Sequence, residues 1–309
     1  AIRRGPLAQP ESGTEVFAPN FGDTNNAEGY LGNVADWALK ANRNNGTYNF
    51  ESFQRLTKTS LLTSATNAEV AVSDNRWDNM IGYRERSQSQ DTEVIMYTFA
   101  RAPGFFDVVA YTGDGTGSSG SGRAVSHNLG VAPEMMWVKQ RNVSGEDWWV
   151  YHSGLDATAP EDYNLILNGT NAKSGVTGAW ARTPPTSAAF FLDQSPVNVS
   201  NGTFIAYLFA TLPGISKVGS ITGTGSEQTI DCGFTSGARF VLIKRVSSTS
   251  DWWVFDTTRG IAVGNDPVLR LNSTDSEGSS DIINPHSSGF TINSTFGASG
   301  VEFIFYAIA

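Results

Sequence analysis

Short runs in which hydrophobic and polar residues alternate dominate this chain of 309 residues. Alternation with a period of two, combined with aromatic and β-branched side chains, is typical of half-buried strands. Turns rich in Gly, Pro, Asn and Ser separate the runs, and no amphipathic helix longer than a turn or two is evident. The clearest runs are 91–100, 105–112, 133–139, 203–210, 240–245 and 301–309. The pattern predicts an all-β protein.

Two markers recur along the chain. The sequence Asp-Trp-Trp-Val occupies 147–150 and again 251–254, which is a step of 104 residues, and a weaker copy lies around Asp36-Trp37. A polar marker recurs with the same step at Thr66, Thr170 and Thr274. Self-similarity at a fixed period is the signature of a repeat architecture. The chain is therefore predicted to hold three repeats of about 100 residues.

The repeats divide the chain into four ranges. Tyr97, Tyr207 and Tyr306 stand at equivalent places in the three closing strands, and each repeat ends near a Pro-Gly turn or at residue 309. We expect tandem β-sandwiches, jelly-roll-like, each enclosing its own core. The predicted ranges are an extended N-terminal arm at 1–33, a first repeat that is divergent or incomplete at 34–103, a second at 104–212 and a third at 213–309.

The tryptophan doublets are the candidate contact residues. Side chains alternate across a strand, so the two rings of one doublet face opposite sides. The outer ring is either covered by a loop, buried in a subunit interface, or free to stack on a sugar. The candidate glycan or interface contacts are Trp148, Trp149, Trp252 and Trp253. The pattern leaves open which ring of each doublet is buried.

Composition excludes several classes of partner. A net charge of −9 argues against nucleic-acid binding, which needs basic patches. The single cysteine, Cys232, cannot form an intrachain disulfide or a cysteine-based zinc site. No apolar run approaches the roughly 18 residues of a membrane span, so membrane insertion is not expected.

The histidines do not predict a catalytic site. His127, His152 and His286 stand in three different local contexts, and none recurs between repeats, since Asp256 replaces His152 in the third. The chain has no Gly-x-Ser-x-Gly elbow between a strand and a helix. We expect no enzyme activity, no catalytic residues, no cofactor and no metal.

The acidic residues that recur between repeats are interpreted as turn residues. Hydrolysis of a glycosidic bond needs two carboxylates that flank it, whereas Asp is common at turns because it caps the backbone. The recurring acids are Asp147 with Asp251 and Glu69 with Glu277. Seven Asn-x-Ser/Thr sequences receive the same interpretation, at Asn45, Asn142, Asn168, Asn198, Asn201, Asn272 and Asn293.

Two runs resemble a known family. The run 101–113 (RAPGFFDVVAYTG) and the run 127–139 (HNLGVAPEMMWVK) are similar to a linker and strands in large structural proteins of tailed bacteriophages, many of them marine or cyanobacterial. Those proteins carry tandem copies of an uncharacterised β-domain, and the resemblance covers about residues 34–309. It implies a virion component, such as a tail fibre or minor tail protein, and it supplies no catalytic residues.

We therefore expect a non-enzymatic virion protein that presents β-sandwich domains for host attachment from a tail fibre or appendage. The expected partners are other phage virion proteins, further copies of the chain in a homo-oligomer (a trimer is favoured) and a host surface glycan. The expected location is the virion, assembled in the host cytoplasm. One alternative is a capsid-decoration or head-fibre protein whose arm at 1–33 docks on other chains. The other is a carbohydrate-binding module or depolymerase.

Overall fold

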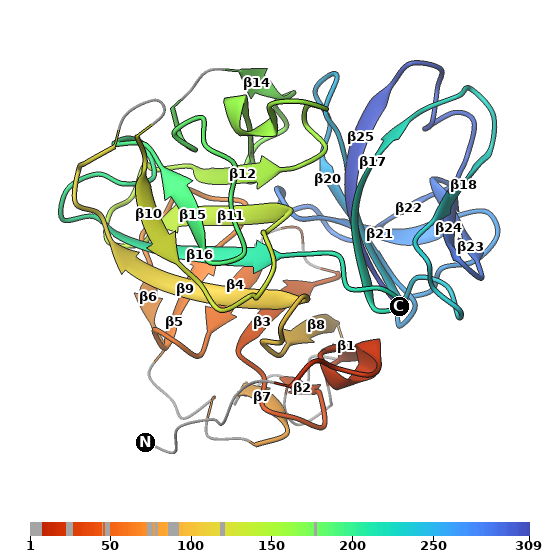
Figure 1. Ribbon diagram of the computed structural model, residues 1–309. Helices are drawn as coiled ribbons and strands as arrows, with labels where there is room; N and C mark the ends of the chain where they lie inside the picture. The colour runs from red at the N-terminus through yellow and green to blue at the C-terminus, as the bar shows by residue number, and fades with distance from the viewer. Residues whose placement is uncertain are drawn as a thin grey trace.

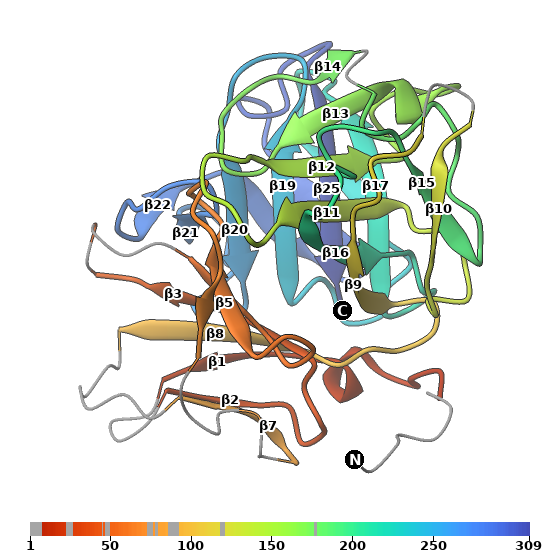
Figure 2. The same ribbon diagram turned by 90° about the vertical axis from the view of Figure 1, so that its left-hand side faces the viewer.

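The computed structural model describes residues 8–22, 27–44, 46, 50–72, 77, 80–85, 93–117, 121–175 and 178–309. The described chain is nearly all β, with several antiparallel sheets, which confirms the all-β fold class. Three parts, which follow one another from red-orange through green to blue, surround a common centre (Figures 1 and 2). Each part corresponds to one repeat.

The elements of the first repeat are η1 (Gly13–Glu15), β1 (Phe17–Phe21), β2 (Ala27–Tyr30), β3 (Trp37–Asn42), β4 (Glu51–Gln54), β5 (Thr59–Leu62), β6 (Val70–Ala71), β7 (Gly82–Glu85) and β8 (Val94–Phe99). Six of the strands form an antiparallel sheet in the order β1-β8-β3-β4-β5-β6, and β2 pairs with β7.

The elements of the second repeat are β9 (Phe106–Thr112), β10 (Arg123–Ser126), β11 (Met135–Gln140), β12 (Trp148–His152), η2 (Pro160–Asp162), β13 (Tyr163–Ile166), β14 (Ser174–Gly175), β15 (Ala189–Leu192) and β16 (Thr203–Phe209). The large sheet has the order β9-β16-β11-β12-β13-β14, and β10 pairs with β15.

The elements of the third repeat are β17 (Ser216–Thr222), β18 (Gln228–Asp231), β19 (Phe240–Arg245), β20 (Trp252–Asp256), β21 (Asp266–Arg270), β22 (Gly278–Ser280), β23 (Ile283–His286), β24 (Gly289–Ile292) and β25 (Glu302–Ile308). The large sheet has the order β17-β25-β19-β20-β21-β22, and a small sheet has the order β18-β24-β23.

The strand order of the large sheet is the same in all three repeats. The opening strands β1, β9 and β17 each lie at one edge and pair antiparallel with the closing strands β8, β16 and β25. β1 lies in the range predicted as an extended arm, so residues 17–21 belong to the first repeat and are not an arm. The repeat is complete, because the strand that pairs with its closing strand is present.

The register confirms one predicted equivalence and corrects another. Tyr97, Tyr207 and Tyr306 face Leu39, Trp137 and Leu242 on the neighbouring strands. The doublet strands β12 and β20 correspond to β4. Glu51 at the start of β4 and Phe50 directly before it take the places of the two tryptophans. Trp37 lies on β3 and is therefore not a first copy of the doublet. A hairpin between β4 and β5 that is shorter than its counterparts hides this correspondence from a fixed 104-residue step.

One core joins the three large sheets. A single cluster of buried residues draws on strands from all three repeats. Aromatic rings meet across each pair of sheets: Trp37 lies 5.7 Å from Trp137, Phe17 lies 5.2 Å from Phe240, and Phe209 lies 5.1 Å from Tyr306. Burial of such large apolar surface is the main stabilising term of folding. Contrary to expectation, the repeats do not fold around three separate cores alone.

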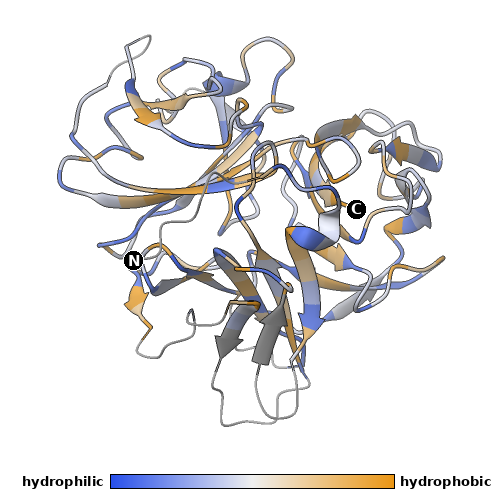
Figure 3. Cartoon of the chain, turned by 60° about the horizontal axis from the view of Figure 1, so that its bottom comes forward, coloured by the Kyte–Doolittle hydropathy of each residue, from blue (hydrophilic) through white to orange (hydrophobic). Residues whose placement is uncertain are grey.

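The outer faces of the large sheets carry the remaining layers. In the second repeat, the β10–β15 pair encloses its own buried cluster, and in the third repeat the β18-β24-β23 sheet does the same. Hydrophobic residues are frequent along the strands, as Figure 3 shows, and the closing strands β8, β16 and β25 are buried over almost their whole length. Alternation places one set of side chains in the shared core and the other in the outer layer.

Candidate functional site

The first tryptophan of each doublet is a core residue that contacts the preceding repeat. Trp148 and Trp252 are fully buried. The Trp148 indole Nε1 donates to the Leu62 carbonyl over 2.9 Å, and the Trp252 Nε1 donates to the Ile166 carbonyl over 3.1 Å. Both bonds span 86 residues, so the same contact is made at two successive junctions between repeats.

The second tryptophan faces the outer layer and is half-buried. Trp149 packs against the outer cluster of the second repeat, and Trp253 packs against that of the third. The Arg270 guanidinium lies over the Trp253 ring, 5.1 Å from its centroid, and the ring edge meets Phe296. Part of this ring is therefore already covered within the chain. That leaves less of the ring for stacking on a sugar.

The aspartate before each doublet holds an asparagine in place. The Asn168 side-chain amide donates to Asp147 over 2.8 Å while its Oδ1 accepts the Trp148 backbone N–H. Asn272 makes the same two bonds with Asp251 and Trp252. Both asparagines belong to Asn-x-Ser/Thr sequences. Their amides serve the doublet strand, which supports the structural interpretation of those sequences.

A buried polar residue at the end of the doublet strand of each repeat contacts the next repeat. The three contacts link the first repeat to the second, the second to the third and the third to the first. The position holds Gln54, His152 and Asp256 in the three repeats, and all three are fully buried. Gln54 accepts a bond from Tyr207 of the second repeat, and Asp256 accepts one from Tyr97 of the first. The register of the three sheets makes these positions equivalent, although their side chains share no chemistry.

His152 makes the contact between the second and third repeats. Its Nδ1 accepts the Gly154 backbone N–H over 2.9 Å, which places the ring proton on Nε2, and Nε2 lies 3.4 Å from the Phe305 carbonyl. Burial lowers the pKa of the imidazole to about 4. The ring is therefore neutral at physiological pH. It joins two repeats and is not in contact with another histidine.

Two buried lysines clamp the first two junctions. Lys139 Nζ donates to the Glu146 carbonyl over 2.9 Å and reaches the Thr66 carbonyl of the preceding repeat at 3.4 Å. Lys244 Nζ makes the corresponding contacts, with Ser250 and with Thr170 of the preceding repeat. Burial lowers the pKa of each ammonium group to about 8. A buried lysine with a lowered pKa can act in catalysis, but here the backbone carbonyls take up the donors.

The marker predicted from the 104-residue step forms the edge of each junction. The backbone N–H groups of Glu69, Lys173 and Glu277 donate to the carbonyls of Arg141, Val246 and Arg43, respectively. Ion pairs reinforce these contacts: Glu69 with Arg141 at 2.7 Å, Lys173 with Glu302 at 2.9 Å, and Glu277 with Arg43 at 2.8 Å. The recurrence of Glu69 and Glu277 reflects contact between repeats, which turn chemistry alone does not explain.

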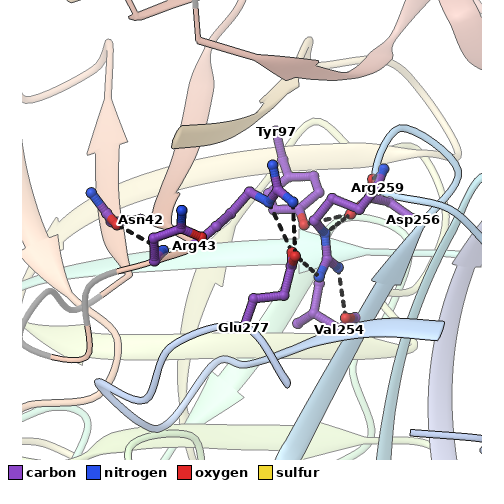
Figure 4. Close-up of polar contacts among 8 residues, drawn as sticks. Asn42, Arg43, Tyr97, Val254, Asp256, Arg259 and Glu277 are labelled. Carbon is purple, nitrogen blue, oxygen red and sulfur yellow. Dashed lines mark hydrogen bonds and ion pairs between the residues drawn. The ribbon is translucent and has the colours of Figure 1, made fainter. Parts of the chain in front are cut away.

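The junction between the third and first repeats has no lysine, since Ala41 takes that position, and a buried ionic network closes it (Figure 4). Arg259 is fully buried and donates to Asp256 over 2.5 Å, to Glu277 over 3.3 Å and to the Val254 carbonyl. Arg43 binds the same Glu277 carboxylate through two nitrogens. Two guanidinium groups thus face two carboxylates.

The electrostatics of this network follow from its burial. Burial lowers the pKa of the Arg259 guanidinium, but Tyr97, Asp256 and Glu277 together raise that pKa above its usual value. Burial raises the pKa of the Glu277 carboxyl, but Arg43 and Arg259 outweigh it, so the net shift is downward. Each charge is stabilised by an opposite charge or a hydrogen bond, so the network has the character of a structural closure.

The three histidines occupy separate environments. His127 stacks on Phe190 in the outer layer of the second repeat, His152 lies in a junction, and His286 lies at a turn of the third repeat. Within the described residues, no group of three or more His, Cys, Asp or Glu side chains is placed to hold a metal ion. The same part of the chain contains no helix with the length and hydropathy needed to cross a membrane.

The lysines of the junctions have a signal in the sequence. Lys139 and Lys244 recur two places after Trp137 and Leu242, in strands whose equivalence the sequence already indicated. Arg259 had no such signal, because it occurs in the third repeat alone. Only the closed arrangement of the repeats brings its partners Asp256 and Glu277 to Tyr97 and Arg43 of the first repeat.

The fold and these junctions define a class of protein: an all-β chain of three equivalent sheets closed around one core. A family model described as a domain of unknown function, DUF7483, matches residues 100–309. The chain belongs to this family. The matched region begins at the linker after β8 and covers the second and third repeats, while the first repeat has the same strand order outside it. No curated protein and no solved structure matches the chain.

Proposed function

We propose that this chain is a non-enzymatic structural protein of a bacteriophage virion, located in a tail fibre or appendage, where its β-sandwich surfaces serve host attachment. The non-enzymatic part of the proposal rests on the closed core. Four buried ionisable side chains have structural partners. Lys139, Lys244 and Asp256 bond to groups of another repeat, and Arg259 pairs with Asp256. Their strong burial thus has a structural explanation.

The virion assignment is supported by the resemblance of 101–113 and 127–139 to phage structural proteins. In the structure these runs are the linker into the second repeat with strand β9, and the segment that leads into β11. Arg101 pairs there with the buried carboxylate of Asp107, which also accepts the backbone N–H of Asn128. The resembling runs therefore contact each other and hold the linker in place. This fits a rigid body in an extended assembly.

Cryo-electron microscopy of purified virions tests the proposal. We expect density at the tail or its appendages that fits three sheets around one core. Density on the capsid surface would instead support a decoration or head-fibre role, and absence from purified virions would contradict both. A test for capsular polysaccharide degradation by the purified protein separates a depolymerase from an attachment protein, and we expect no degradation.

Assembly into a homo-oligomer, with a trimer favoured, is part of the same proposal. The inner faces of the three large sheets are already buried within one chain. An interface with further copies or with other virion proteins must therefore use the outer surfaces or the sheet edges. Size-exclusion chromatography with light scattering measures the oligomer number, and a stable monomer at high concentration would contradict a self-assembling appendage.

A further inference from the structure

An open cleft lies on the third repeat, away from the junctions described above. It has a volume of about 230 Å³. Three segments line it: the loop before β19 at 236–238, the loop after β20 at 257–261, and the end of β23 with the residue after it at 285–287. Small-molecule sites usually enclose roughly 300–1,000 Å³, so this cleft is suited to one unit of a longer ligand.

Backbone hydrogen bonds hold the walls of the cleft in place. The Gly237 N–H donates to the Ser287 carbonyl over 2.8 Å, and the Ala238 N–H donates to the Gly289 carbonyl over 2.9 Å. The loop after β20 is held by its own residue Arg259, whose buried side chain pairs with Asp256. A preformed site loses little conformational entropy when a ligand binds.

The lining combines hydroxyl groups, one imidazole and a small apolar surface. Ser236, Thr257 and Ser287 supply hydroxyl groups, and Ile261 and Pro285 supply apolar contact. No Asp, Glu, Lys or Arg is among the lining residues. Hydroxyl groups can both donate and accept hydrogen bonds. A ligand with many hydroxyl groups and an apolar C–H face matches this combination.

His286 places an imidazole in the lining. Its Nδ1 lies 3.3 Å from the Ser288 backbone N–H and 3.1 Å from the Ser288 hydroxyl group. With Nδ1 as the acceptor of these bonds, Nε2 is the ring's donor. In the second repeat, β15 corresponds to β24, because the two strands pair with β10 and β18 in the same register. Thr186, three residues before β15, therefore takes the position of His286. Its hydroxyl group is occupied by the Ala189 backbone N–H. The second repeat has no imidazole at this chain position; its own His127 directly follows β10 and lies 3.1 Å from the Thr186 carbonyl.

We propose that this cleft binds one unit of a neutral saccharide on the host surface. The proposal deepens the attachment role and rests on it for its biological setting. The neutral class follows from the absence of Asp, Glu, Lys and Arg among the lining residues and from the net charge of −9, which disfavours an anionic sugar. The cleft differs from the half-buried doublet rings, because Arg270 already covers part of Trp253.

Titrations followed by NMR test the site on the full chain. The probes are the methyl glycosides of glucose, galactose, mannose and N-acetylglucosamine, with glucuronic acid as the anionic comparison. We expect saturable shifts of the His286 imidazole and the Ile261 methyl signals with at least one neutral glycoside, and none with glucuronic acid.

Three variants make the test specific. His286→Thr, which installs the residue of the second repeat, should weaken binding at least tenfold, and Ser236→Trp at the rim should abolish it. Val263→Ala is the matched control, because Val263 lies in the loop after β20, is 85% exposed and does not line the cleft. This variant should bind the glycoside like the parent. Thermal unfolding of each variant confirms that it is folded.

Two results would overturn the site: no saturable shift with any neutral glycoside, or equal affinity in the parent and in both cleft variants. Either result leaves the virion proposal intact if the chain is found in virion density. Conversely, if the chain binds a saccharide but is absent from virions, the virion proposal is contradicted and the saccharide site in the cleft is supported. The two proposals can therefore fail separately.

Discussion

At the scale of single residues, adjacent side chains on one strand have different tasks. Trp148 is fully buried between repeats and donates to Leu62, whereas Trp149 is half-buried in the outer layer. Alternation predicted that the two rings face opposite sides. It could not predict which side holds the shared core, because both faces of the sheet are covered.

Truncation of each ring should therefore give unequal losses. Trp148→Ala removes a fully buried ring and leaves the Leu62 carbonyl without its donor, so we expect a loss of about 3–5 kcal/mol in the free energy of unfolding. Trp149→Ala should cost clearly less. Urea unfolding of both variants measures the difference, and equal losses would contradict the assignment of the inner ring.

His152 predicts a pH dependence of stability. Its pKa falls from 6.5 to about 4 on folding because of burial, so the unfolded chain binds more protons between these values. The stabilisation is fully present above pH 6.5 and is lost as the pH falls toward 4, at a total of about 3 kcal/mol. His152→Gln, which copies Gln54 of the first repeat, should reduce the slope.

Denaturant unfolding at intervals from pH 7.5 to 4.5 measures this effect. Carboxylates also titrate at the acid end, so the informative quantity is the difference between the parent and His152→Gln at each pH. If the two proteins lose stability in parallel down to pH 4.5, burial of a neutral His152 is not a source of the pH dependence.

At the scale of elements, the junctions show how copies of one unit become different. Lysines clamp two junctions, and the third uses Arg259, Asp256, Glu277 and Arg43. A lysine that donates to carbonyls needs only the backbone of the preceding repeat, whereas the ionic closure needs matched side chains on two repeats. The sequence period predicted the positions that the repeats share. It did not predict that an ionic network replaces the lysine at the third junction.

Loss of Arg259 should destabilise the closing junction strongly. Arg259→Leu leaves the buried Asp256 carboxylate with the Tyr97 hydroxyl group but without its positively charged partner. Breaking a buried pair from one side costs about 3–5 kcal/mol. The double variant Arg259→Leu with Asp256→Asn removes the charge that was left, so it should recover part of the loss. Chemical denaturation of the single and double variants tests this; a double variant less stable than Arg259→Leu would contradict the explanation.

At the scale of the whole molecule, the shared core makes the three repeats depend on one another. The buried cluster joins strands of all three large sheets. Repeats in an open array contact only their neighbours, whereas here the third also contacts the first. The whole chain should therefore behave as one cooperative unit.

Differential scanning calorimetry measures this cooperativity. We expect a single transition with equal calorimetric and van't Hoff enthalpies. Trp37→Ala, a substitution in the first repeat at the centre of the shared core, should shift the entire transition to a lower temperature. Separate transitions, with only one of them displaced by this substitution, would show that the repeats unfold independently.

The sequence by itself determined the all-β class, the number of repeats and the equivalence of Tyr97, Tyr207 and Tyr306, because alternation and period are local properties that survive in each copy. It misplaced the first copy of the doublet at Trp37, because a shortened hairpin between β4 and β5 changes the step between equivalent strands. It also left β1 out of the first repeat, because the sequence of that strand (FAPNF) does not resemble β9 (FDVVAYT). Only the tertiary structure decided that the sheets share one core, that Tyr97 meets Asp256 and that Arg43 meets Glu277. Those contacts join residues that no local pattern relates, and they form only when the third repeat closes on the first.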